Sequence, residues 1–220
     1  MAKRDQRRQE LINATISVVA AHGYSETTVS RVAKEAGLSL GLMHFYFKSK
    51  DHLFEETLRH LSDEYDLVWQ AAVREFDGSA PRRLVGMIYA FFDRQVFSHD
   101  RLAVWFAFWA DAKLRDRFRQ DVVKTEQRYS RAIMQTVREI SADAKLDKAH
   151  GDLIATSLIS MIDGFWLQFM INPQTATRNR AISSCLSFLR LTLPDLAAVW
   201  DAESKSIAQK RPRRKLQAVG

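Results

Sequence analysis

The chain has 220 residues, of which 46% are hydrophobic, with 8 glycines and 4 prolines. This composition supplies enough apolar side chain for a packed interior and excludes a disordered or collagen-like chain. Because glycine and proline are few, we expect an all-α protein. The formal net charge of +7 suggests a nucleic-acid partner, but residues 204–220 contain six basic residues and no acidic one. The remainder is close to neutral, so net charge alone does not identify the partner.

Several classes of protein are disfavoured by what the sequence lacks. The one cysteine, Cys185, cannot form an internal disulfide and lies among apolar residues, as a buried thiol does. The N-terminus has no secretory signal, and the longest apolar run, residues 103–110, is too short to cross a bilayer. The six histidines show no metal-ligand spacing, and no nucleophile or phosphate-loop motif is present. We therefore expect a cytoplasmic protein that is not an enzyme, with no membrane partner, catalytic residue, metal or cofactor.

After a first helix expected over residues 6–22, the stretch TTVSRVAKEAGLSLGLMHFYFKSK predicts two short helices joined by a tight turn. Thr27 or Thr28 can cap the first of these helices, and Gly37 suits the left-handed position that ends it. Ser39 then caps a short second helix. Two short helices crossing at such a turn form a helix-turn-helix, whose second helix enters the major groove of DNA.

This stretch resembles the DNA-binding motif of TetR-family transcriptional regulators, T-x-x-x-[VI]-A-x-x-A-G-[LV]-S-x-G-x-x-x-x-[YF]-F-x-[SD]-K. The matching residues are Thr28, Val32, Ala33, Ala36, Gly37, Leu38, Ser39, Gly41, Tyr46, Phe47, Ser49 and Lys50. The resemblance implies a three-helix DNA-binding domain over residues 1–50 and a helical ligand-binding and dimerisation domain over residues 51–196. It also implies a dimer that binds double-stranded DNA at an inverted-repeat operator.

The expected DNA contacts fall into two groups. Leu40, Met43 and His44 are the side chains most able to reach base edges, while Gly41 allows the backbone to approach closely and Phe45 is expected to pack inward. By the family pattern, a second group is expected to contact phosphates: Thr28, Ser39, Tyr46 and Lys50. Since the short helix lacks arginine, lysine, asparagine and glutamine, we expect recognition to depend largely on DNA shape and methyl contacts.

The rest of the chain predicts a series of long helices, over residues 50–76, 81–97, 101–112, 115–141, 148–172 and 175–193. The helix over 148–172 is too apolar for a half-exposed surface helix. By the same resemblance, the last two helices form a four-helix bundle with the same pair of a second subunit, which makes the protein a homodimer. The polar, basic segment 197–220 is expected to be a disordered tail.

Two aromatic clusters indicate a ligand site in this second domain. Trp105 and Trp109 are four residues apart and share one helix face, while Asp163 and Trp166 are three apart and share another. Tryptophan faces with a carboxylate suit a quaternary ammonium ion, because cation–π attraction replaces water. The simpler alternative is that these aromatics only fill the core. A carboxylate within an apolar run nevertheless needs a partner, which could be arginine, a backbone donor or a cationic ligand.

The segments AVWFAFWADAKLRDRFR and MIDGFWLQFMINP are similar to those of BetI-type choline-responsive repressors. This resemblance implies a repressor that choline releases from DNA and that controls genes of glycine betaine synthesis. The alternative is a TetR-type regulator of an efflux or catabolic operon with another cationic or hydrophobic effector.

Overall fold

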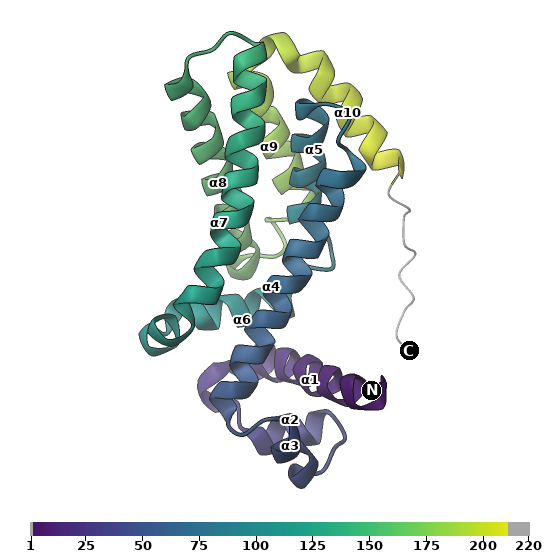
Figure 1. The fold of residues 1–220 in the computed structure, drawn as a ribbon, viewed down its shortest axis with the longest axis vertical. Coiled ribbons are helices and arrows are strands. Elements are labelled where there is room, and N and C mark those ends of the chain that lie inside the picture. Colours follow the sequence, from purple (N-terminus) through teal and green to yellow (C-terminus); the bar gives the residue numbers. More distant parts are fainter. Residues whose placement is uncertain (1, 211–220) are drawn as a thin grey trace.

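The computed structural model describes the backbone of residues 2–210 and their side chains except those of residues 2, 117–123 and 210. Throughout this range the secondary structure is helical, without a strand, which confirms the predicted all-α class. Figure 1 shows an elongated molecule with α1, α2 and α3 at one end and a larger helical body at the other. The α-helices are α1 Ala2–Glu26, α2 Val29–Glu35, α3 Leu40–Tyr46, α4 Lys50–Glu75, α5 Ala80–Phe91, α6 His99–Ala110, α7 Ala112–Asp143, α8 Lys148–Ile171, α9 Arg178–Thr192 and α10 Ala197–Lys210.

The small end of the molecule is held together by one apolar cluster. Leu11 of α1, Val32 of α2 and Met43 of α3 are fully buried in it, as is Phe47 just after α3. The local signals act as predicted: α1 loses helical geometry at Gly23, whose φ is 75°, and Gly37 is left-handed with φ 64° after α2. These turns set α3 across α2 in a helix-turn-helix (Figure 1).

Helix α4 belongs to both ends of the molecule. Ser49 caps it by accepting a hydrogen bond of 3.1 Å from the backbone N–H of His52. Leu53 and Phe54 are buried near its start, and Trp69 is buried in the larger body near its other end. A helix of 26 residues therefore connects the two parts as one continuous rod (Figure 1).

In the larger body α5 and α7 pack against the upper part of α4, α8 packs against α7, and α9 packs against α8 and α5 (Figure 1). The predicted end of α5 is wrong. Helix α5 stops at Phe91, and the backbone N–H groups of Val96 and Phe97 close a turn on the Asp93 carbonyl, where the sequence predicted helix to residue 97. Helix α6 lies between the two parts and packs against α1.

The prediction of a disordered tail is wrong for residues 197–210, which form α10. Trp200 and Ile207 are fully buried against the body, and Tyr89 Oη lies 3.0 Å from Ser204 Oγ. Arg82 also pairs with Glu203 at 2.8 Å. Residues seven apart lie on one face after two turns, so two apolar side chains suffice to anchor this polar helix. The part of the predicted tail over 211–220 lies outside the described residues.

Candidate functional site

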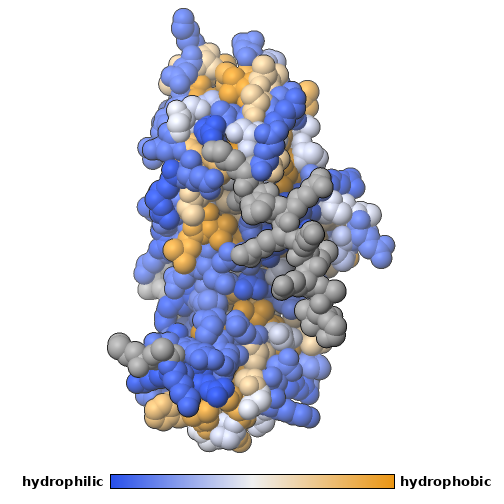
Figure 2. Space-filling model, turned by 90° about the vertical axis from the view of Figure 1, so that its right-hand side faces the viewer, coloured by the Kyte–Doolittle hydropathy of each residue, from blue (hydrophilic) through white to orange (hydrophobic). Residues whose placement is uncertain are grey.

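Helix α3 presents an apolar and aromatic surface at the tip of the small end. Ser39 caps it by accepting from the N–H of Leu42 at 3.2 Å, which fixes where the helix starts. Leu40 is 44% exposed and Phe45 is 68% exposed, and His44 is also exposed. Figure 2 shows hydrophobic side chains at this lower end of the molecule. The guanidinium of Arg4 lies 5.7 Å above the Phe45 ring.

The predicted roles of two neighbouring side chains on α3 are exchanged in the structure. Met43, expected to reach base edges, is fully buried between the helices of the small domain. Phe45, expected to pack inward, is exposed and meets Tyr46 edge to face at 5.3 Å. Two helical residues two positions apart point to nearly opposite sides, so an error in helix phase exchanges them. The outward set on α3 is therefore Leu40, Gly41, His44 and Phe45.

The candidate phosphate-contacting residues all lie at the same end. Thr28 and Ser39 are exposed, and each uses its hydroxyl oxygen to cap a helix. Tyr46 is half-buried. Lys50 donates to the backbone carbonyls of Tyr24 and Ser25, and its ammonium lies 4.0 Å above the Tyr24 ring. Burial lowers the pKa of Lys50. Its first role in this structure is to tie the end of α1 to the start of α4, which leaves one of its three donors for a phosphate.

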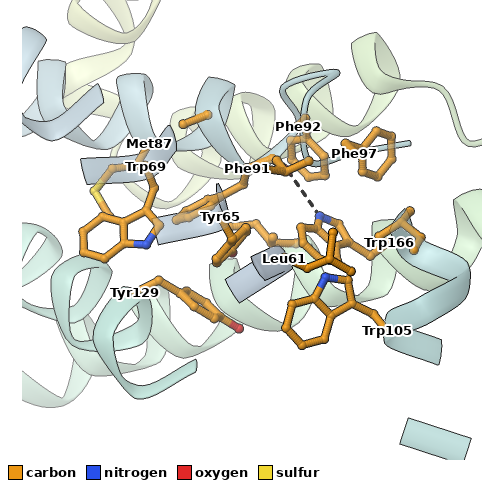
Figure 3. Packing of buried hydrophobic residues seen from close by; sticks show 14 of the residues in the cluster. Leu61, Tyr65, Trp69, Met87, Phe91, Phe92, Phe97, Trp105, Tyr129 and Trp166 are labelled. Atoms are coloured by element: carbon orange, nitrogen blue, oxygen red, sulfur yellow. Dashed lines mark hydrogen bonds between the residues drawn. The ribbon is translucent and has the colours of Figure 1, made fainter. Parts of the chain in front are cut away.

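All four predicted ligand residues line one cavity in the larger body. The cavity holds about 370 Å³ of space between atoms, part of it open to solvent. The Trp105 and Trp109 rings stack at a centroid distance of 6.1 Å. Trp166 donates from Nε1 to the Phe91 carbonyl at 3.3 Å, so its ring is fixed in orientation (Figure 3). The lining residues are Tyr65, Trp105, Trp109, Thr125, Glu126, Tyr129, Asp163 and Trp166.

Three important lining residues were not predicted from the sequence. Tyr65 of α4 meets Trp166 edge to face at 5.4 Å and Tyr129 edge to face at 5.5 Å (Figure 3). Glu126 and Tyr129, three residues apart on α7, share one face of that helix. The sequence of α7 is rich in charged residues, so these positions do not stand out in it. The three-residue spacing of Glu126 and Tyr129, which matches that of Asp163 and Trp166, was the available signal.

The cavity is electrostatically negative. Asp163 Oδ1 accepts a hydrogen bond of 3.2 Å from the Tyr129 hydroxyl. The partner of this carboxylate is therefore a neutral group, which does not balance its charge. Partial burial raises the pKa of Asp163, and burial together with the charge of Asp163 raises the pKa of Glu126. Burial and both carboxylates raise the pKa of Tyr129, so its hydroxyl keeps its proton. Aromatic faces beside two carboxylates form a site that favours a cation.

A polar chain joins the small end to the cavity wall. Arg101, four residues before Trp105 on α6, donates two hydrogen bonds to Glu64 of α4, at 3.0 and 3.1 Å. His60 Nε2 lies 3.5 Å from Glu64 Oε1 and 3.0 Å from Gln9 Nε2 on α1. Burial alone would raise the pKa of Glu64, but the hydrogen bonds from His60 and Arg101 lower it to about 2. The ion pair with Arg101 therefore persists at neutral pH.

Helices α8 and α9 leave apolar side chains in the open. The exposed residues are Leu153 (66%), Leu167, Ile171 and Leu191 (82%). By length and composition α8 could cross a membrane, and only 28% of that stretch is buried in the monomer. Because α8 and α9 pack against each other, these exposed side chains belong to two neighbouring helices.

Comparison with known proteins decides the family. Residues 11–57 match the model of bacterial regulatory proteins of the TetR family, and residues 80–194 match that of the BetI-type transcriptional repressor C-terminal domain. The chain belongs to the TetR family of transcriptional regulators, with a BetI-type C-terminal domain. It is therefore a repressor that binds operator DNA rather than an enzyme, and proteins of this family act as dimers that respond to small molecules.

Similar proteins extend this family assignment over most of the chain. The transcriptional regulator BetI of Paraburkholderia phymatum is 31% identical over 89% of this chain and 97% of its own. That of Klebsiella pneumoniae is 29% identical over 86% and 95%. A regulator from Saccharomonospora viridis, solved in complex with choline, has a TM-score of 0.70 at 22% identity, over 84% of this chain and 96% of its own. The FadR regulator of Bacillus subtilis, solved with stearoyl-CoA, has a TM-score of 0.64 at 19% identity, over 84% of this chain and 97% of its own.

Proposed function

We propose that this TetR-family repressor senses choline and controls genes of glycine betaine synthesis. The observation that supports this most is the cavity, in which three tryptophans and two tyrosines surround space beside Asp163. A trimethylammonium group has no hydrogen to donate, so it is recognised by ring faces and a nearby negative charge. The BetI names of the relatives and the choline complex of a similar structure agree with this chemistry.

The alternative effector is a larger hydrophobic or cationic molecule, as the stearoyl-CoA complex of a similar fold illustrates. The small size of this cavity favours the smaller ligand, since its about 370 Å³ of space between atoms includes open solvent and the enclosed part is smaller still.

Titration with choline, followed by tryptophan fluorescence, tests the effector, because Trp105, Trp109 and Trp166 line the cavity. We expect a saturable change, and choline added to a gel shift with the DNA upstream of the gene should release the protein. No fluorescence response at millimolar choline would contradict the assignment.

On the DNA side, we propose that Leu40, His44 and Phe45 contact base edges while Thr28, Ser39, Tyr46 and Lys50 position the protein on phosphates. The exposed side chains of α3 are apolar apart from His44, so thymine methyl groups and DNA shape suit them better than the polar edges of guanine. Gly41 has open space around it, so close approach of a DNA backbone there meets no side chain.

A second copy of the chain is the proposed cover for the exposed surface of α8 and α9. Two such surfaces related by a two-fold axis would make a four-helix bundle, and would set the two α3 helices apart by about 34 Å or a multiple of it. Leu153→Glu combined with Ile171→Glu should yield a monomer in size-exclusion chromatography with light scattering. A dimer unaffected by both changes would place the interface elsewhere.

A further inference from the structure

The effector cavity contains a second carboxylate, Glu126, in addition to Asp163. Glu126 lies on α7 one turn before Tyr129, and Asp163 lies on α8, so the two acids come from different helices to one space. Both residues are exposed to solvent, although neighbouring side chains partly desolvate their carboxyl groups, which places them where the cavity meets water.

Neither carboxylate is neutralised by a basic side chain among the residues that the structure describes. Asp163 accepts from the uncharged Tyr129 hydroxyl, and Glu126 has no hydrogen-bond or ion-pair partner within that part of the chain. The other titratable groups of the lining, Tyr65 and Tyr129, have pKa values raised by burial and cannot supply positive charge. Two like charges therefore line one cavity together with the aromatic rings, an arrangement that a bound cation relieves.

We propose that Glu126 is a charge-selecting residue, which together with Asp163 restricts the effector site to cations that have no carboxylate of their own. This rests on the proposed function, because it takes the aromatic cavity as the effector site. A trimethylammonium group among the rings benefits from both acids. A zwitterion such as glycine betaine holds its own carboxylate only two bonds from that nitrogen, so its negative end lies within a few ångströms of Glu126 or Asp163.

Such a repressor distinguishes choline, an alcohol, from glycine betaine, the carboxylate formed by its oxidation. Like charges placed against each other cost enough to weaken binding by about 100-fold. Because Glu126 is partly solvated and therefore screened, its own share in choline affinity should be smaller, roughly tenfold.

Calorimetric titration of the full-length protein with three ligands tests this proposal. Choline has the positive charge, glycine betaine adds a carboxylate, and 3,3-dimethylbutan-1-ol keeps the shape of choline without charge. Wild-type protein should prefer choline to betaine by about 100-fold. Glu126→Gln should weaken choline binding roughly tenfold and narrow the preference for choline over glycine betaine. The affinity for the uncharged alcohol should hardly change.

The matched control is Asp143→Asn, which removes the same charge from an exposed position near the end of α7 and should change nothing. Glu126→Asp keeps the charge and should restore much of the preference for choline. If the wild type binds choline but Glu126→Gln leaves the choline-to-betaine ratio unchanged, Glu126 does not select charge and only this proposal is overturned. If the wild type binds none of the three ligands, both the role of Glu126 and the assignment of choline as effector are contradicted.

Discussion

The two functional ends of the molecule place their important side chains in opposite ways. On α3 the candidate DNA-reading residues Leu40, His44 and Phe45 project from the surface and contribute little to the core. In the effector cavity the aromatic residues are buried and form part of the core: Tyr65, Trp105, Tyr129 and Trp166. Function and stability are therefore separable at the DNA end and combined at the effector end. Substitutions at each end test whether stability and function separate in this way.

The largest effect is expected for Trp166→Ala. Removing a buried tryptophan leaves a cavity and should reduce the free energy of unfolding by about 3–5 kcal/mol. It also leaves the Phe91 carbonyl without its donor and removes one wall of the effector site. Chemical denaturation measures the first effect, and choline titration measures the second. Trp166→Phe, which keeps the ring but loses the N–H, should recover most of the stability. A full loss of choline response without loss of stability would contradict the view that this site is part of the core.

The next effect concerns the DNA end, where Phe45→Ala should weaken operator binding by about 1–3 kcal/mol. Stability should hardly change, because the ring is 68% exposed. Fluorescence anisotropy with operator and with random DNA measures the loss, which should appear for the operator alone.

The comparison variant is Met43→Ala, in the same helix. Its side chain is fully buried, so this change should cost about 2–5 kcal/mol of stability. If instead Met43→Ala alters base preference in a protein that remains fully folded, the original assignment of Met43 to the DNA face is restored.

A third prediction uses pH. Burial raises the pKa of Asp163 above its usual value of 3.8 and also raises that of Glu126. A cationic ligand favours the ionised carboxylates, so choline binding releases protons. Affinity should be constant above the raised pKa values and fall as the pH drops through them, by at most about tenfold per pH unit for each acid. The decline should therefore begin at a higher pH than an ordinary carboxyl group predicts. Calorimetry across this range measures it, and Asp163→Asn should make the curve shallower.

The smallest effect is expected between the two ends. Arg101→Gln breaks the ion pair with Glu64 and should change the coupling between choline and operator affinity by roughly 0.5–2 kcal/mol. Operator affinity measured with and without saturating choline gives this coupling directly. The control is Arg138→Gln, which breaks the ion pair between Arg138, in the far part of α7, and Asp152 of α8. Equal coupling in both variants would show that the Arg101 pair has only a local role.

Much of the small domain could be predicted from the sequence, because its signals are local. Caps at Thr28, Ser39 and Ser49 and turns at Gly23 and Gly37 depend on backbone geometry within a few residues. The assignment of Met43 and Phe45 failed because α3 is only seven residues long. A helix of two turns shows too little of its period to fix which apolar side chain faces in.

The effector site was predicted in part for a related reason. Trp105 with Trp109 and Asp163 with Trp166 follow from spacing within one helix. The sequence does not show that these helices meet, or that Tyr65 and Glu126 lie beside them. Both depend on packing between segments far apart in the chain. Likewise, α10 is stabilised by the burial of Trp200 and Ile207 against distant helices, and no local pattern in its polar sequence showed this.

Helix α6 finally has a consequence for how this regulator can change over evolution or by engineering. It contributes Trp105 and Trp109 to the effector wall, Arg101 to the ion pair with α4, and a packing surface against α1. A mutation on this helix is therefore pleiotropic, since it alters ligand preference and operator occupancy together. Helix α7 supplies Glu126 and Tyr129 to the same cavity. A biosensor with a new ligand range is best built by varying α7 and leaving α6 intact.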